Sequence, residues 1–429
     1  MPRRLLPAPS RAPLAVWISV LALMSAIAPL ATDMYLPTFP RLAADLGTTA
    51  SNVQLTLTAF LVGLAVGQLV FGPLSDSWGR RRLLLGGTAV CALATLACAV
   101  APDVWVFIAA RFVMGFAGGA GVVLSLAVVV DRTTGDRAAR LFSVMMAIQG
   151  LAPIVAPLLG GTLAAAVGWR GIFWVLTGVT SVMFLGVLTT IPETLPAERR
   201  GAGGIASMAR DLGSVLRRRR YVGYLLGYAL AFAALFAYIS GSPFVLQGVL
   251  GLSQAQYTLA FAVNAVGLAA ASVLNVRLVG RYTPRRLALG GVTALVSCSA
   301  ILLVVVLAGA PRWPVLALLF ASVFSVGFVL GNGSALAVKE VPDIAGTGSA
   351  LLGALQYGLG AAVSPLVGAN PVTMATLMLS AGVLALGSYT LLARGPGRRT
   401  SPPVAAVDRG GVDRGGVDAV DPPEQGRRR

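Results

Sequence analysis

Long apolar runs constrain the fold of this 429-residue chain more than any other feature of its sequence. Twelve segments of roughly twenty residues are almost free of charge, and a helix of about that length crosses the ~30 Å hydrocarbon core of a bilayer. Strands of a membrane barrel would alternate apolar and polar residues instead. The sequence therefore predicts an all-α integral membrane protein. The expected spans are Leu14–Tyr35, Val53–Leu74, Leu83–Ala101, Val104–Val130, Leu141–Val167, Gly171–Ile191, Tyr221–Phe244, Gln254–Val276, Leu287–Leu307, Pro314–Ala337, Ile344–Val367 and Val372–Leu392.

Basic residues gather on one side of these spans. The chain carries 33 Lys and Arg against 16 Asp and Glu, a net charge of +17. With the N-terminus in the cytoplasm, 29 of the 33 lie at the cytoplasmic face, and only Arg41, Arg170 and Arg312 lie at the outer face. Cytoplasmic loops of membrane proteins are enriched in Lys and Arg in this way. We therefore expect a multi-pass protein of the plasma (inner) membrane with both termini in the cytoplasm. Its partner is the lipid bilayer; binding of nucleic acid would need one folded basic face.

The second half of the sequence repeats parts of the first. Arg81–Gly87 recurs as Arg285–Gly291, at the start of the third span of each half. Gly150–Gly160 recurs as Gly358–Gly368, in the fifth span of each half. Repeated halves are common in secondary transporters, whose substrate site lies between them. The expected organisation is a cytoplasmic N-terminal segment over 1–13, a six-helix bundle over 14–191, a cytoplasmic central loop over 192–220, a second six-helix bundle over 221–393 and a disordered cytoplasmic tail over 394–429.

Two charged residues fall inside expected spans. Asp33 lies near the outer end of the first span, and Arg111 is the only basic residue within a span. A charged side chain at the bilayer centre costs about 2.5–3.5 kcal/mol on insertion scales, so it usually has a partner or a function. Spans one and four run in opposite directions, which places both residues in the outer half. We hypothesise that Arg111 stabilises the charged form of Asp33 until a proton or substrate releases it. The alternatives are an acid at the outer headgroups and an arginine that snorkels to the interface.

The fifth span is rich in glycine and proline. Proline bends a membrane helix, and glycine allows a neighbouring helix to approach closely. We interpret this span as a kinked packing face that closes the pathway against ion leak. The residues concerned are Gly150, Pro153, Pro157, Gly160 and Gly161.

Polar and aromatic residues on other spans are candidates for lining a substrate cavity. Tyr228, Phe232 and Phe236 recur at every fourth position of the seventh span, on one helix face, and aromatic rings suit flat apolar substrates. For each candidate, ordinary packing or a hydrogen bond between helices is the alternative. The other candidates are Gln149, Asn264, Asn332, Gln356 and Tyr357.

Four segments resemble a known family. The polar loop Gly72–Arg82, with the sequence Gly-Pro-Leu-Ser-Asp-Ser-Trp-Gly-Arg-Arg-Arg, resembles the signature loop between the second and third helices of the major facilitator superfamily. Thr32–Pro37, Gln54–Thr58 and Ala345–Gly353 are similar to segments of its bicyclomycin and chloramphenicol resistance branch, a group of drug:proton antiporters. The resemblance covers the chain from the first to the twelfth span. It implies twelve transmembrane helices in two pseudo-symmetric six-helix bundles.

The resemblance also implies roles for individual residues. Asp76 would dock near the start of span eleven and form a conformational latch with Gly72, Gly79, Arg80 and Arg81. Asp33 matches the acid that couples protons to substrate, Arg111 matches the arginine of the span-four motif, and the glycines and prolines of span five match the antiporter motif. Met114 stands where the span-four motif usually has glutamine.

We therefore expect proton-coupled efflux of small, largely apolar drugs, such as chloramphenicol-like or bicyclomycin-like compounds. The proton gradient would drive a monomer without any cofactor. The alternative within transport is a proton-coupled uptake symporter for a sugar or organic anion, whose cavity would carry more polar groups. An enzyme is disfavoured, because intramembrane catalysis needs clustered acids, a serine–lysine pair or a histidine-bound metal. The chain has no histidine, and Lys339 is its only lysine.

Overall fold

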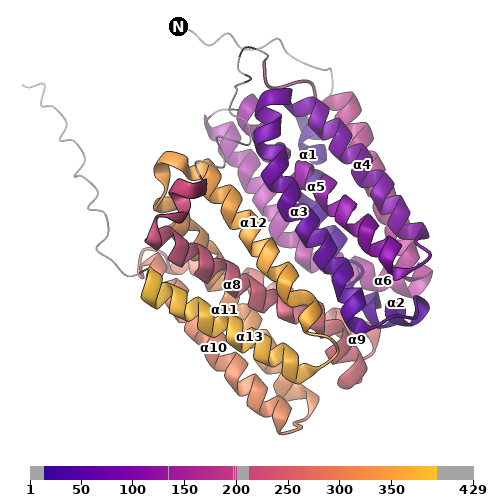
Figure 1. The fold of residues 1–429 in the computed structure, drawn as a ribbon, viewed down its shortest axis with the longest axis vertical. Coiled ribbons are helices and arrows are strands. Elements are labelled where there is room, and N and C mark those ends of the chain that lie inside the picture. Colours follow the sequence, from indigo (N-terminus) through magenta and orange to yellow (C-terminus); the bar gives the residue numbers. More distant parts are fainter. Residues whose placement is uncertain (1–13, 134, 197, 199, 201–211, 394–429) are drawn as a thin grey trace, which may run out of the picture. The chain divides into compact units, whose positions relative to one another are not determined.

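The computed structural model describes residues 14–393, except 134, 197, 199 and 201–211 (Figure 1). The expected terminal segments 1–13 and 394–429 lie outside the described residues, as does part of the central loop. The regular elements within the described part of the chain are all helices. The main helices of the first half are α1 (Leu14–Asp33), α3 (Ala50–Trp78), α4 (Arg80–Val100), α5 (Val104–Arg132) and α6 (Gly135–Thr190).

The second half begins after the central loop. Short π-helical or 3₁₀ turns extend three of its helices: η3 (Pro243–Val249), η5 (Ser364–Leu366) and η6 (Ser388–Leu392). These turns lie where the expected spans seven, eleven and twelve run past the regular α-helix. The main helices of this half are α8 (Arg219–Ser242), α9 (Gln254–Leu278), α10 (Pro284–Leu307), α11 (Arg312–Lys339), α12 (Ala345–Val363) and α13 (Pro371–Gly387).

Ten helical segments among the described residues are long and apolar enough to cross a membrane. This number is compatible with twelve spans for two reasons. The long helix α6 contains the fifth and sixth spans, which meet at Gly168, where φ is 67° and the backbone is no longer helical. The helix α12 is not among the ten, because its 19 residues include several glycines and the polar pair Gln356 and Tyr357. Each expected span therefore coincides with a helix, and the all-α, twelve-span fold is confirmed.

A short helix between α1 and α3 was not expected from the sequence. After Asp33 the chain forms a 3₁₀ turn, η1 (Leu36–Thr38), and then α2 (Phe39–Asp45). Pro37 and Pro40 lie in the first turns of these two elements, where a missing backbone N–H costs nothing. We name the end of the helices that carries residues 34–49 the outer end, following the orientation that the charges indicate.

Glycines set the closest helix crossing in the first half. A side-chain carbon on Gly67 of α3 would lie 2.2 Å from the carbonyl oxygen of Phe116 in α5. One on Gly115 of α5 would lie 2.0 Å from the carbonyl oxygen of Phe60 in α3. Only glycine fits at such distances, and close backbone approach is how small residues hold membrane helices together.

The two halves meet along two pairs of helices. The helix α3 of the first half packs against α12 of the second, and α6 packs against α9 (Figure 1). The short elements η1 and α2 also contact η3 of the second half at the outer end. The remaining helix contacts lie mostly within one half or the other. This arrangement leaves room for a cavity between the halves.

Candidate functional site

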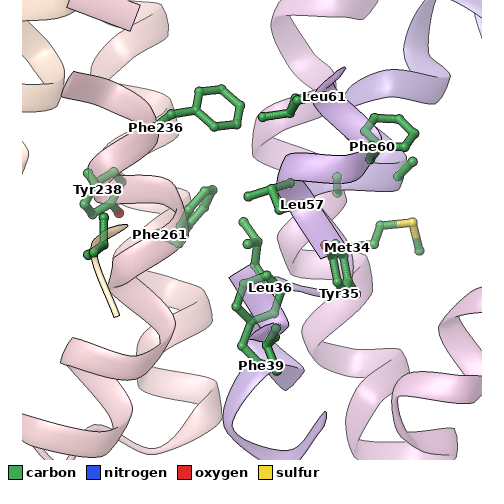
Figure 2. Packing of buried hydrophobic residues seen from close by; sticks show 14 of the residues in the cluster. Met34, Tyr35, Leu36, Phe39, Leu57, Phe60, Leu61, Phe236, Tyr238 and Phe261 are labelled. Atoms are coloured by element: carbon green, nitrogen blue, oxygen red, sulfur yellow. The ribbon is translucent and has the colours of Figure 1, made fainter. Parts of the chain in front are cut away.

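A cavity of about 240 Å³ lies between the two halves. Its lining residues come from α1, α3, α5 and α6 on one side and from α8, α9, α11 and α12 on the other. Most of them are apolar. Figure 2 shows Phe236 of α8 pointing toward Leu61 of α3, and both side chains line the cavity. A substrate in this cavity would contact both halves at once, as alternating access requires.

Asp33 is the only charged residue among those that line the cavity. It is the last residue of α1, and only 6% of it is exposed. No arginine or lysine of the described residues lies within ion-pair distance of its carboxylate. The neighbouring Thr32 turns its hydroxyl back to the carbonyl oxygen of Ala28, at 2.9 Å. Asp33 is therefore the one carboxyl group in the cavity wall.

Aromatic rings form much of the wall on the second half. The rings of Phe232 and Phe236 lie 4.8 Å apart, and Tyr357 meets Phe232 edge-on, with 5.7 Å between ring centroids. Asn264 donates a hydrogen bond to the hydroxyl of Tyr238 at 2.6 Å, and both residues line the cavity. Gln149 is a polar lining residue on the opposite half. Five of the residues predicted to line a substrate cavity are thus part of its wall: Gln149, Phe232, Phe236, Asn264 and Tyr357.

Three of the predicted lining residues are absent from the wall. Tyr228 donates to the side-chain oxygen of Gln356, which joins α8 to α12. Asn332 donates to the side-chain oxygen of Asn275 at 2.6 Å, which joins α11 to α9. The expectation that these residues line the cavity is therefore corrected. Each satisfies its polar group against a neighbouring helix, which was the alternative at the level of the sequence.

Arg111 is fully buried inside the first half, away from the cavity wall. One of its guanidinium nitrogens donates to the hydroxyl of Tyr35 at 3.2 Å, and another approaches the carbonyl oxygen of Thr56 at 3.4 Å. Its charge lies over three rings, 4.3 Å from the centre of Phe60, 4.6 Å from that of Tyr35 and 5.8 Å from that of Phe173. Such cation–π contacts stabilise a desolvated cation.

The hypothesis of an Asp33–Arg111 pair is therefore wrong for this structure. The chain turns sharply after Asp33, so Tyr35, two residues later, faces Arg111 in its place. Met114, which stands where the related motif has glutamine, also contacts the guanidinium, with 3.6 Å between Nη1 and Sδ. Asp33 and Arg111 occupy separate environments, one in the cavity and one in the core of the first half.

The glycines of span five bring α6 against two other helices. A side-chain carbon on Gly160 would lie 1.8 Å from the carbonyl oxygen of Met34, and one on Gly161 would lie 2.5 Å from the hydroxyl of Thr258 in α9. Gln254 of α9 also donates to the carbonyl oxygen of Gly161, at 3.3 Å.

The other residues of that set have different surroundings. Pro153 lines the cavity and Pro157 is buried, whereas no atom lies within 4 Å of a side-chain carbon on Gly150. Among the three glycines of this set, only Gly160 and Gly161, near the outer end, are closely approached by a neighbouring segment.

Gln54 joins the two halves at the outer end. Its side-chain nitrogen donates to the carbonyl oxygens of Ser240 at 3.0 Å and Gly368 at 2.8 Å. Its side-chain oxygen accepts from the backbone nitrogen of Gly368 at 3.0 Å. One turn further along α3, Thr58 donates to the carbonyl oxygen of Ala361 at 2.9 Å. No individual role was expected for Gln54, although a glutamine within an expected span is itself a signal for such a bond.

The predicted latch loop contacts its own half. Asp76 forms an ion pair with Arg80 at 2.8 Å, and 55% of the Asp76 side chain is exposed. Arg80 also pairs with Asp131 at the end of α5, at 3.3 Å. Arg81 donates to the carbonyl oxygen of Ile191 at 2.9 Å. The expected docking of Asp76 at the start of α12 is therefore not seen. The halves are joined at the outer end in this structure, and the loop lies at the opposite end.

A carboxylate that the sequence did not single out lies beneath this loop. Glu193, which follows α6, accepts hydrogen bonds from the backbone nitrogens of Arg80 at 2.9 Å and Arg81 at 3.3 Å. These are the first two residues of α4, whose N-terminal N–H groups have no partner within the helix. A carboxylate there satisfies them and complements the positive end of the helix dipole. Gly79, with φ at 91°, makes the tight turn that presents these groups.

The family of the chain follows from a comparison with known proteins. Residues 21–365 match the family model described as the Major Facilitator Superfamily. This protein belongs to that superfamily, which places it among multi-pass membrane transporters and not in an enzyme class.

Three relatives align with more than half of the chain. It is 38% identical over 356 residues to the uncharacterized MFS-type transporter YdgK of Bacillus subtilis, covering 82% of this chain and 89% of the relative. It is 34% identical to a bicyclomycin resistance protein homolog of Haemophilus influenzae, covering 85% and 92%. It is 33% identical to a chloramphenicol resistance protein of Pseudomonas aeruginosa, covering 63% of each. The resemblance to drug antiporters of this superfamily is thereby confirmed.

The fold is also similar to a solved structure. A crystal structure of a D-xylose–proton symporter aligns with a TM-score of 0.71 over 89% of this chain and 98% of the symporter. The two sequences are 16% identical, so the likeness concerns the fold alone.

Proposed function

We propose that this protein exports small, largely apolar drugs or antibiotics in exchange for protons, by alternating access of the central cavity to the two sides of the plasma membrane. It acts as a monomer with both termini in the cytoplasm. One observation carries the proposal: the cavity between the halves has a mainly apolar wall and a single acidic residue, Asp33. The relatives named for resistance to bicyclomycin and chloramphenicol support this substrate class.

The cavity wall suits a small, flat, weakly polar molecule. Stacked and edge-on rings at Phe232, Phe236 and Tyr357 offer large contact area with few polar atoms. Gln149 and Asn264 provide hydrogen-bonding groups on opposite sides of the cavity and can orient a substrate. A volume of about 240 Å³ lies below the ~300–1,000 Å³ of common drug sites, which favours small substrates over bulky ones.

Asp33 couples the proton to the substrate in this proposal. Its neutral and charged forms give the cavity different polarity, so protonation changes the affinity for an apolar substrate. A ligand shifts the equilibrium between two states only by its difference in affinity for them. The charged carboxylate accepts hydrogen bonds from the donor groups of a weakly polar drug, and the protonated form accepts fewer. Proton binding from the outside would therefore weaken substrate binding and release the drug, and proton loss to the cytoplasm would reset the site. The proton gradient then supplies the driving force, and no cofactor takes part.

Uptake of a sugar or organic anion is the less favoured alternative. A sugar has hydroxyl groups on every side and needs many hydrogen-bonding partners, because unpaired polar groups cost free energy on burial. The cavity wall offers few hydrogen-bonding partners. Arg111, the cation that would attract an organic anion, is buried away from the cavity.

Drug accumulation in a host that lacks its own efflux pumps tests the proposal. Cells that express this protein should accumulate less chloramphenicol or bicyclomycin than control cells, and an uncoupler that collapses the proton gradient should abolish the difference. Asp33→Asn should remove proton-driven efflux, because the amide keeps the shape of the side chain but cannot exchange a proton.

Asp103→Asn is the matched control. Asp103 is exposed at the outer face and caps the start of α5, and asparagine caps helices equally well. This variant should export like the wild type. Uncoupler-sensitive export by Asp33→Asn at the wild-type rate would defeat the coupling role of Asp33. Accumulation of a sugar in place of drug export would favour the symporter.

A further inference from the structure

The helices α10 and α11 enclose a second hollow, separate from the central cavity. It is a groove of about 510 Å³, lined only by residues of these two helices. It shares no lining residue with the central cavity. Its wall includes Phe320, Phe324 and Phe328, and all three rings are at least partly exposed. A half-exposed apolar groove on the outside of a membrane protein is filled by lipid, because water molecules there would lack hydrogen-bond partners.

Aromatic side chains of α11 form one wall of the groove, and glycines of α10 lie on the other side. The three phenylalanines recur at every fourth residue of α11, with neighbouring ring centroids 6.0 and 5.7 Å apart. On α10, no atom lies within 4 Å of a side-chain carbon on Gly290. At Gly291 the helices approach closely, since a side-chain carbon there would lie 2.8 Å from the carbonyl oxygen of Ser325. The shape therefore suits one long, narrow apolar chain.

One end of the groove carries a free cation. Arg286 lines it at the first turn of α10, and its side chain is exposed. No acidic residue in the described part of the chain pairs with its guanidinium. The positive end of the α10 dipole lies at the same place and adds to the attraction for an anion. The neighbouring Arg285, by contrast, turns to the carbonyl oxygen of Tyr389 at 3.4 Å.

The length of the groove matches one leaflet of the bilayer. Arg286 and Cys298 line its two ends on α10, twelve residues apart, which is about 18 Å at a rise of ~1.5 Å per residue. Half of the ~30 Å hydrocarbon core is about 15 Å. With Arg286 at the cytoplasmic interface, the groove reaches slightly past the middle of the membrane.

We propose that this groove is a binding site for an anionic phospholipid of the cytoplasmic leaflet, with the lipid phosphate on Arg286 and one acyl chain along Phe328, Phe324 and Phe320. The guanidinium and phosphate form charge-assisted hydrogen bonds, which are stronger than neutral ones. Basic pockets between membrane helices on the cytoplasmic side recognise anionic headgroups in this way. A zwitterionic lipid fits the apolar wall equally well but gains less at Arg286, since its own cation offsets the phosphate.

The native cysteines provide a direct test. Cys298 lines the groove and is partly exposed, whereas Cys91 and Cys98 are buried. Alkylation by N-phenylmaleimide, followed by mass spectrometry of the full-length protein in mild detergent, therefore reports on occupation of the groove. Added phosphatidylglycerol should slow alkylation of Cys298 about tenfold more than phosphatidylcholine, the scale of one charge-assisted hydrogen bond. High salt should reduce this difference, because it screens the headgroup contact.

Two variants identify the residue responsible. Arg286→Gln should abolish the preference for phosphatidylglycerol. Arg281→Gln removes another exposed cation at the same end of the helices that does not line the groove, and it should keep the preference. Equal protection of the wild type by both lipids would overturn the proposal without any variant. Persistent preference in a folded Arg286→Gln protein would overturn it as well.

Discussion

Arg111 places a guanidinium nitrogen 3.2 Å from the hydroxyl of Tyr35, two residues beyond the acid that lines the central cavity. The same hydroxyl lies 3.0 Å from that of Thr56 on α3. The bonds of this one tyrosine thus connect the end of α1 to α3 and α5, and the arginine charge is satisfied without Asp33. Arg111 has a structural environment, whereas Asp33 faces the cavity.

Tyr35→Phe should destabilise the protein while leaving its packing intact. Phenylalanine keeps the ring beneath the guanidinium but leaves a buried Arg111 nitrogen without its partner. Loss of a hydrogen bond to a charged group costs about 1.5–3 kcal/mol. Thermal unfolding in detergent measures the change. The control is Tyr282→Phe, at a tyrosine that is 52% exposed, which should unfold like the wild type. Equal stability of both variants would show that the Arg111–Tyr35 bond contributes little.

Gly160→Ala should destabilise the contact between α6 and the end of α1. The added methyl group would lie 1.8 Å from the carbonyl oxygen of Met34, so backbone has to shift, at about 1–3 kcal/mol. Gly150→Ala in the same helix adds the same group where nothing lies within 4 Å. It should be neutral, or stabilising by up to about 1 kcal/mol through helix propensity. Melting temperatures of the two variants measure the difference. Equal values would contradict the close approach of Gly160 to the carbonyl oxygen of Met34.

Gln54→Ala should open the outer end. Alanine removes three hydrogen bonds between the halves, and neutral bonds contribute about 1 kcal/mol each. The conformational equilibrium of the protein should therefore shift from the closed outer end seen here toward a state in which that end is open. Spin labels at positions 41 in α2 and 249 in η3, in a chain without other cysteines, can measure the distance across that end.

The control for this shift is Asn52→Ala, on the same helix. The Asn52 side chain donates only to the nearby hydroxyl of Thr48, at 3.0 Å. Longer distances should gain population in Gln54→Ala and stay at the wild-type level in Asn52→Ala. An unchanged distribution in Gln54→Ala would mean that the halves are held together by other contacts.

Glu193→Ala should loosen the start of α4 and the latch loop before it. The carboxylate accepts from the backbone nitrogens of Arg80 and Arg81, and loss of such a helix cap costs typically about 1 kcal/mol. Thermal unfolding again measures the change. Glu198→Ala removes an exposed acid five residues further along the same segment and should leave the melting temperature unchanged. A similar fall in melting temperature in both variants would show that the loss of a negative charge, and not the loss of the helix cap, causes the change.

The helices were predictable because the signal for a membrane span is local. A run of about twenty apolar residues has to be a helix in lipid, whatever surrounds it. The bounds of α5 and α9 accordingly differ from the expected spans by two residues, at one end only. The short helix α2 was missed because its prolines indicate an end to α1 and say nothing about the turn that follows.

The candidate site was predictable in part, for a related reason. A charged residue in a membrane span, or aromatic residues along one face of it, can be recognised in the sequence, and Asp33, Phe232 and Phe236 do line the cavity. The sequence carries no information on which neighbour a long polar side chain reaches. Tyr228 and Asn332 therefore looked like cavity residues, although each bonds to an adjacent helix.

The sequence by itself determined the membrane spans, the two repeated halves and the presence of one acid and one arginine within the bilayer, because hydropathy and charge act residue by residue. The tertiary structure alone decided which residue meets which. It turned the chain at residues 34–38 so that Tyr35 reaches Arg111, and it placed Gln54 against the backbone of the other half. Such contacts depend on how helices far apart in the sequence cross, and a single polar side chain at a crossing has several partners within reach until the packing selects one.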